Sequence, residues 1–141
     1  MLYVLTIIGI ILADRAPLDA EEAVVQMVLQ EAEGEPSQGQ IAVAGVAFDR
    51  VKDRRWPDTL DAVIYQPRQF TGMWKRPREY EPEQVARARR SVMIARQGFR
   101  PCGAGVFWYH STGIERPAKW PPMEVRCTIG GHVFYGDEKS S

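Results

Sequence analysis

Glu31 is a carboxylate on a helical stripe that is otherwise apolar. Val24, Met27 and Val28 precede it at helical spacing, so we expect all four side chains on one side of a helix. Gly34 predicts the end of that helix, which places Glu31 in the last turn. Burial and the negative end of the helix dipole should both raise its pKa, as general acid catalysis requires. The alternative is a helix-end glutamate turned into solvent.

Two further glutamates lie close to Glu31 in the chain. Cleavage of a glycosidic bond uses one carboxylic acid to protonate the leaving oxygen, and usually a second carboxylate as base or nucleophile. Glu35, or Glu33 between them, supplies that second group if the chain turns suitably after Gly34. Otherwise both belong to a solvated acidic turn.

The residues around Glu31 carry a family signature. The run QEAEGEPSQGQIAVAGVA, residues 30–47, resembles the signature of the SleB-type cell-wall hydrolases, which are spore-cortex-lytic and related peptidoglycan-cleaving enzymes. The resemblance continues in the family's order over about residues 22–136, in blocks at 50–51, 56–59, 66–71, 105–110, 120 and 129–135. Asp49 departs from it, since the family usually has asparagine there, and we find no counterpart of the peptidoglycan-binding module that many members carry.

The resemblance implies a lysozyme-like α+β fold with a cleft between helices and a β-region. It also implies cleavage of the MurNAc–GlcNAc β-1,4 linkage of peptidoglycan. In a lytic transglycosylase the muramyl 6-hydroxyl of the substrate attacks, so a single glutamate serves as acid and then as base. Glu31 stands at the matching position.

The same resemblance indicates substrate-binding residues. The block 69–71 faces the cleft in the related enzymes, so Gln69 and Thr71 are candidates to bind sugar or Glu31, while Phe70 is expected in the core. The family pattern also favours Tyr109 as a cleft residue. Adjacent residues of a strand face opposite ways, which leaves Trp108 in the core. Trp120 is expected to be exposed and able to stack on a sugar ring.

Two other functions remain open from the sequence. A non-catalytic wall-binding module would keep the aromatic residues of the cleft without needing Glu31. A metal-dependent wall amidase or peptidase would need a ligand set, but His110 and His132 are far apart and no HExxH motif is present. We therefore expect no metal and no cofactor.

The composition indicates one ordinary globular domain of 141 residues, 45% apolar and 26% charged. Eighteen basic residues balance eighteen acidic ones, which gives no overall attraction to nucleic acid. Basic residues cluster at 75–78 and between 87 and 100. The second cluster is either a solvated helix face or a rim that attracts anionic wall polymer.

The pattern predicts a mostly helical α+β fold with a small antiparallel β-region. Helices are expected at about 20–33, 38–53, 59–66 and from Pro82 to Gly98, with capping by Asp19 and Glu22, by Ser37 and Gln40, and by Asp58. The last helix carries the stripe Val85, Ala88, Val92, Ala95 and Phe99. Strands are expected at 106–109 and 132–135, and long loops at 67–80 and 113–122.

The two cysteines, Cys102 and Cys127, fit either a disulfide or two thiols packed as small hydrophobic groups.

Residues 1–18 form a separate apolar segment before the single catalytic domain expected over 19–141. Residues 2–13 carry no charge and would make a helix of about 18 Å, short of a hydrocarbon core of roughly 30 Å. A signal peptide, a signal-anchor and a packed element all fit. The first two place the protein in the cell envelope, with possible membrane association through residues 2–13.

We predict that this segment determines location and takes no part in the chemistry. Deletion of residues 1–17 should leave a soluble protein that still cleaves cell wall, measured by turbidity loss of purified walls. A truncated protein that cannot fold would show instead that the segment belongs to the core.

Overall fold

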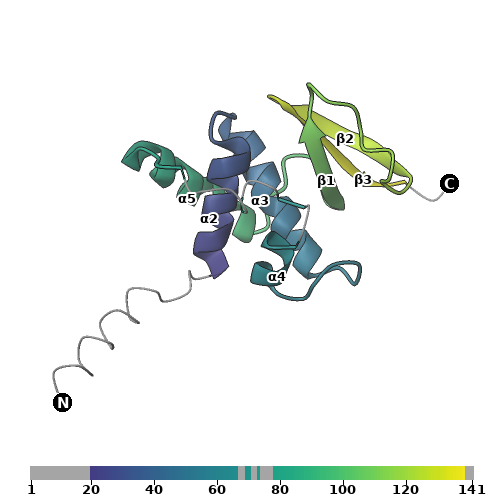
Figure 1. Cartoon of the computed structure of the whole chain (residues 1–141), viewed down its shortest axis with the longest axis horizontal. Coiled ribbons are helices and arrows are strands. Elements are labelled where there is room, and N and C mark those ends of the chain that lie inside the picture. The colour runs from purple at the N-terminus through teal and green to yellow at the C-terminus, as the bar shows by residue number, and fades with distance from the viewer. Residues whose placement is uncertain (1–19, 67–68, 71–72, 74–77, 139–141) are drawn as a thin grey trace, which may run out of the picture.

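The computed structural model describes residues 20–66, 69–70, 73 and 78–138. Helices come first along the chain and strands come after them, and Figure 1 shows the helices gathered on one side of the molecule with the sheet beside them. The elements are α2 (Ala20–Ala32), α3 (Ser37–Val51), α4 (Leu60–Ile64), α5 (Pro82–Arg96), β1 (Val106–Ser111), β2 (Met123–Ile129) and β3 (His132–Asp137). This is the mostly helical α+β architecture that the sequence predicts.

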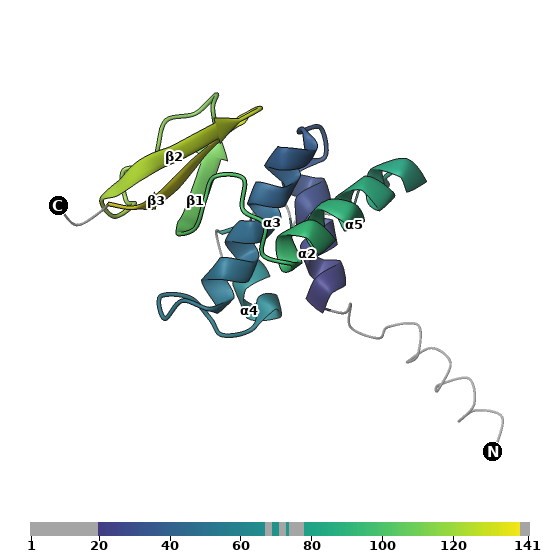
Figure 2. The same cartoon turned by 180° about the vertical axis from the view of Figure 1, so that it is seen from behind.

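Helix α3 is the centre of the fold. Every residue from Gly39 to Ala47 is buried, so this helix is enclosed on all sides, as expected of one that packs between other elements. It contacts α2, α4, α5 and β1, and both cartoon views show it between α2 and the sheet (Figures 1 and 2). Its small residues permit this close packing. Gly45 lies against Arg100, since a Cβ at this position would stand 2.9 Å from Arg100 Cδ.

The starts of α3 and α4 differ from the predicted caps, and the predicted cap Asp19 lies outside the described residues. Thr59, and not Asp58, caps α4, because its Oγ1 accepts a hydrogen bond from Ala62 N. The predicted Ser37–Gln40 capping box is wrong, since the N-cap of α3 is Pro36 without a side-chain bond. Gln40 is buried and turns back toward the end of α2 instead.

Helix α5 begins with a capping box that the sequence analysis missed. The backbone amide of Glu81 donates to Gln84 Oε1 at 2.8 Å, and Pro82 occupies the first turn. The predicted stripe of this helix holds for Ala88, Val92 and Ala95, which are buried. It fails at Phe99, which lies beyond the helix end and is 51% exposed.

The three strands form one antiparallel sheet in the order β1-β3-β2. Strands β1 and β3 contain the two predicted segments, and β2 is an additional strand. Tyr109 and Phe134 pair across the sheet and pack with the helical core, whereas Trp108 joins a second cluster with Met123 and Tyr135. Trp108 and Tyr109 therefore face opposite sides, as expected of strand neighbours.

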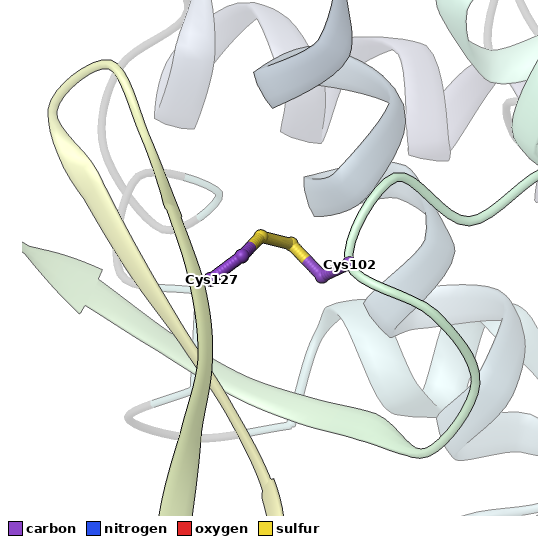
Figure 3. The surroundings of a disulfide bond; sticks show 2 residues. All are labelled: Cys102 and Cys127. Atoms are coloured by element: carbon purple, nitrogen blue, oxygen red, sulfur yellow. A yellow bond between two sulfur atoms is a disulfide. The ribbon is translucent and has the colours of Figure 1, made fainter.

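A disulfide joins Cys102 to Cys127, which decides between the two alternatives left by the sequence (Figure 3). Cys102 lies after α5 and Cys127 lies in β2, so the bond ties the helical part of the chain to the sheet. Both residues are partly buried against the main core. Among the described helices, none is long and apolar enough to span a bilayer, and residues 1–18 lie outside the described part.

We predict that the disulfide stabilises the fold without taking part in catalysis. It closes a loop with a sequence separation of 25 residues, so the double variant Cys102→Ser/Cys127→Ser should lose about 3 kcal/mol of unfolding free energy. Urea denaturation measures the loss, and the variant should still cleave wall below its melting temperature. Identical denaturation of the wild-type protein with and without reductant would contradict the prediction.

Candidate active site

A cavity of about 600 Å³ lies between the helices and the sheet. Five of the candidate residues predicted from the sequence line it, together with Arg50, Phe70, both histidines and part of the 111–117 loop. These five are Glu31, Glu35, Gln69, Tyr109 and Trp120. Thr71 lies outside the described residues. Residues from both ends of the domain thus meet at one concave surface.

Glu31 reaches the cavity from the last turn of α2. Val24, Met27 and Val28 on its stripe are fully buried, while Glu31 is half-buried at the cavity wall. The helical spacing therefore places this carboxylate where the apolar stripe of α2 meets the cavity.

The end of α2 is fixed by side chains from other helices. Gln40 Nε2 donates to Ala32 O at 3.1 Å and is itself held by Ser91 Oγ, which donates to Gln40 Oε1 at 2.9 Å. Arg87 Nη2 donates to Glu35 O at 2.6 Å. The Gln40 bond adds a side-chain donor to a carbonyl of the last turn of α2, and the Arg87 bond fixes the turn that follows it.

Tyr109 contributes a buried hydroxyl to the same cavity. Burial raises the pKa of Tyr109 well above its ordinary value, and the charge of Glu31 raises it further while Arg50 opposes the shift. The phenol is therefore protonated and can donate a hydrogen bond. Its oxygen has no hydrogen-bond partner among the described residues.

Glu35 lines the cavity but its carboxylate is engaged by the β2–β3 turn. Oε2 accepts a hydrogen bond from Gly131 N at 2.9 Å. A Cβ on Gly130 would stand 2.0 Å from Oε2, and one on Gly131 would stand 2.7 Å from Oε1. The φ of Gly130, +54°, also favours glycine. The two glycines thus make room for the carboxylate, which ties the α2–α3 turn to the sheet.

The two histidines stand at different positions of the cavity wall. His132 Nδ1 lies 3.8 Å from Glu35 Oε1, and burial lowers the pKa of His132 below its ordinary 6.5, although Glu35 opposes the shift. His132 is therefore neutral at neutral pH and does not form a charged pair with Glu35. His110 Nε2 lies 2.8 Å from Tyr135 OH. No group of three or more His, Cys, Asp or Glu in the described residues could hold a metal ion.

Trp120 lies at the part of the cavity formed by the 111–117 loop. Its ring packs against those of His110 and Tyr135, with centroids 5.8 Å apart in both pairs. The indole is half-buried, so this aromatic support leaves part of it facing outward.

Arg50 is a cavity residue whose role the sequence analysis missed. Its side chain is buried, yet it donates from Nε to Phe107 O and from Nη1 to Gln69 Oε1, both at 2.9 Å. Burial lowers the pKa of Arg50 to about 10, so the group is still a cation at neutral pH. The signal available in the sequence was an arginine near the end of a long apolar helix, within a block of the family resemblance.

Arginines of the cluster between 87 and 100 form ion pairs and hydrogen bonds with other parts of the domain. Arg89 and Arg96 pair with Glu22 and Glu21 of α2, and Arg87 donates to the carbonyls just after α2. Arg100 pairs with Asp49, with Nε to Oδ2 at 2.9 Å. Arg89 and Arg96 are exposed, so they belong to a solvated helix face whose charges are paired with α2, while Arg87 and Arg100 fix the turn after α2 and the C-terminal part of α3.

A helical domain with a carboxylate at the wall of a cleft beside a small sheet is the arrangement of lysozyme-like proteins. The sequence profile described as Cell Wall Hydrolase matches residues 34–135. The chain belongs to this family.

Curated relatives agree with this assignment. A spore cortex-lytic enzyme of Oceanobacillus iheyensis is 34% identical over 107 residues, covering 76% of this chain and 38% of that protein. A spore cortex-lytic enzyme of Halalkalibacterium halodurans is 31% identical over 113 residues, covering 80% and 33%. The chain therefore spans well under half the length of these enzymes. It is 28% identical to the cell wall hydrolase CwlJ of Bacillus subtilis, over 82% of that protein.

Two solved structures share the fold. The catalytic domain of the Bacillus cereus SleB protein matches with a TM-score of 0.68 and 28% identity, covering 82% of this chain and 88% of that one. The catalytic domain of the germination-specific lytic transglycosylase SleB of Bacillus anthracis matches with a TM-score of 0.65 and 29% identity, covering 86% and 97%. The similarity extends across both the helices and the sheet.

We predict that Glu35 stabilises the domain through its bond to Gly131. Glu35→Ala should lower the unfolding free energy by about 2 kcal/mol, because it removes a charge-assisted hydrogen bond to a backbone amide. Glu35→Gln should cost less, since its amide oxygen can still accept that bond. Urea denaturation measures both, with Glu79→Ala at an exposed position as control. If Glu35→Ala were as stable as Glu79→Ala, the carboxylate would not be a tether.

Proposed function

We propose that this chain is a peptidoglycan-cleaving glycosidase that acts on the MurNAc–GlcNAc β-1,4 linkage as a lytic transglycosylase. The observation that carries the proposal is the place of Glu31, a carboxylate at the end of an apolar helix stripe and at the wall of a 600 Å³ cavity. The family and the lytic transglycosylase among its structural relatives support it.

In the proposed mechanism, Glu31 acts twice. Its protonated carboxyl group donates a proton to the glycosidic oxygen, so that the bond from the muramyl C1 to this oxygen breaks and the GlcNAc end leaves with a hydroxyl group. The resulting carboxylate then accepts the proton of the muramyl 6-hydroxyl as that oxygen bonds to C1. A 1,6-anhydro ring forms, no water is consumed, and Glu31 regains its proton.

The contacts of Glu35 favour this mechanism over one with two carboxylates. A hydrolytic muramidase needs a second carboxylate that can act as base or nucleophile. The Glu35 side chain already accepts a hydrogen bond from the Gly131 amide, and it fills the space left by two glycines. Its position therefore suits a structural role better than a change of protonation in each turnover.

The other cavity residues supply groups that a glycan needs. Gln69 offers an amide and Trp120 a ring that can stack on a sugar face, and Tyr109 lines the same cavity as a further candidate. Thr71 remains a candidate from the sequence. The proposed partner is the glycan strand of peptidoglycan, which places the protein in the cell envelope, reached by export or by membrane anchoring through residues 2–13.

Two other functions would give different results. A wall-binding module would retain walls without releasing fragments, whatever residue stood at position 31. A metal-dependent amidase or peptidase would cut peptide bonds and lose activity in chelator. Mass spectrometry of peptidoglycan digests separates all three, because each produces a different set of fragments.

We predict that Glu31→Gln lowers cleavage by at least the roughly 10²–10⁴-fold typical of general acid catalysis. The substitution keeps the size and hydrogen-bonding reach of the side chain but removes the transferable proton. Folding should be unaffected, as checked by thermal denaturation. Fragment release from purified peptidoglycan is the activity measurement, and anhydro ends identify the transglycosylase product.

Glu35→Gln is the matched control for Glu31→Gln, and it should be milder. Near-normal activity of Glu31→Gln combined with complete loss in Glu35→Gln would show that the other carboxylate is the acid. Severe loss in both variants, with reducing ends as the wild-type product, would indicate a two-carboxylate hydrolase.

A further inference from the structure

Arg50 is a buried cation whose hydrogen bonds, among the described residues, go to neutral oxygens. Only 4% of it is exposed, and it donates to Phe107 O and Gln69 Oε1. The guanidinium carbon also lies 5.1 Å from the ring centroid of Trp56 and 5.3 Å from that of Phe70. A buried charge is costly unless its contacts compensate for lost hydration, so this arrangement needs an explanation.

The contact with Gln69 joins this buried group to an exposed side chain at the cavity. Gln69 lies in the turn before Phe70 and is exposed, a setting in which a glutamine side chain normally samples several rotamers. Arg50 Nη1 donates to its Oε1 at 2.9 Å. A guanidinium group has donors only, so the glutamine atom that faces it must be the oxygen. The amide nitrogen is therefore left on the opposite side, as a donor.

We propose that Arg50 is a positioning residue that fixes the Gln69 amide so that its NH₂ group is presented to the oxygen atoms of a bound glycan. This inference rests on the proposed function, because it assigns Gln69 a role in the same cavity. Glycans carry hydroxyl, ether and acetamido oxygens, all of which accept hydrogen bonds from such a donor. Fixing the amide before substrate arrives reduces the ordering cost at binding.

The fixing of the Gln69 amide by Arg50 depends on the shape of the guanidinium group. Nε is bonded to the backbone of β1 while Nη1 is bonded to Gln69, so the two donors span from the sheet to the 69–70 turn. The rings of Trp56 and Phe70 also pack close to its carbon. A lysine keeps the charge but has a single nitrogen and no planar fork, so it cannot reproduce both bonds in this geometry.

A double-mutant cycle tests the inference on purified glycan strands. We expect Gln69→Ala and Arg50→Lys each to lower kcat/KM by about tenfold or more, with the same division between kcat and KM. The double variant should be no worse than Gln69→Ala, because Arg50 acts through Gln69. Additive losses would overturn the proposal, since a merely structural arginine would lower activity equally with or without Gln69.

Gln69→Glu changes an exposed residue, so its result does not depend on whether a variant with an altered core, such as Arg50→Lys, still folds. Its carboxylate keeps an oxygen toward Arg50 at an exposed position but removes the NH₂ donor. We expect a loss of kcat/KM similar to that of Gln69→Ala. Wild-type activity in Gln69→Glu would overturn the proposal, because the donor would then be unnecessary.

Side-chain relaxation measured by NMR separates this inference from the proposed function. The Gln69 NH₂ group should be ordered in the wild-type protein and mobile in Arg50→Lys. Equal mobility in the two proteins would overturn the proposal that Arg50 fixes the Gln69 amide. If the wild-type protein cleaved no glycan, the proposed function would fail, while this measurement would still decide whether Arg50 fixes the amide.

Discussion

The site depends on one constraint, which is that the backbone carbonyls at and just after the end of α2 must receive hydrogen bonds. A helix end leaves carbonyl groups without helical partners, and here that end is packed against α3 and α5. Gln40 donates to Ala32 O at this end and is held in turn by Ser91, while Arg87 donates to Glu35 O in the turn that follows. Glu31 belongs to this last turn. Its position relative to the cavity is therefore fixed by three side chains that do not themselves line the cavity.

Two tethers then set the sheet against this helical frame. The disulfide joins the segment after α5 to β2, and the Glu35–Gly131 bond joins the α2–α3 turn to the β2–β3 turn. Both act on β2 or its turn, which lies farther along the sheet from α3 than β1 does. Strand β1 contacts α3 directly, so the three connections together fix the width of the cleft that Tyr109 and His132 line.

Periodicity and composition were enough to predict the elements that carry the site. The apolar stripe of α2, the four helices and strands β1 and β3 all have helical or strand-like spacing, and this spacing placed Glu31 correctly at a helix end. Periodicity does not show which distant partner a polar side chain selects. The spacing of Gln40 from Ser37 predicts a local cap, whereas its side chain donates a hydrogen bond to the preceding helix. The role of Arg50 has no periodic signal for the same reason, since both of its hydrogen bonds reach residues distant in sequence.

Asp49, where the sequence resemblance leads us to expect asparagine, is paired with an arginine. Arg100 donates to both oxygens of Asp49, from Nε at 2.9 Å and from Nη2 at 3.0 Å, and Nη1 donates to Ala95 O. An asparagine has one acceptor oxygen and no charge, so it could not form this two-oxygen pair. The arginine also needs the space that Gly45 leaves. None of these residues lines the cavity, so the Asp49–Arg100 pair joins α3 to the segment leading to Cys102 without involving the groups around Glu31.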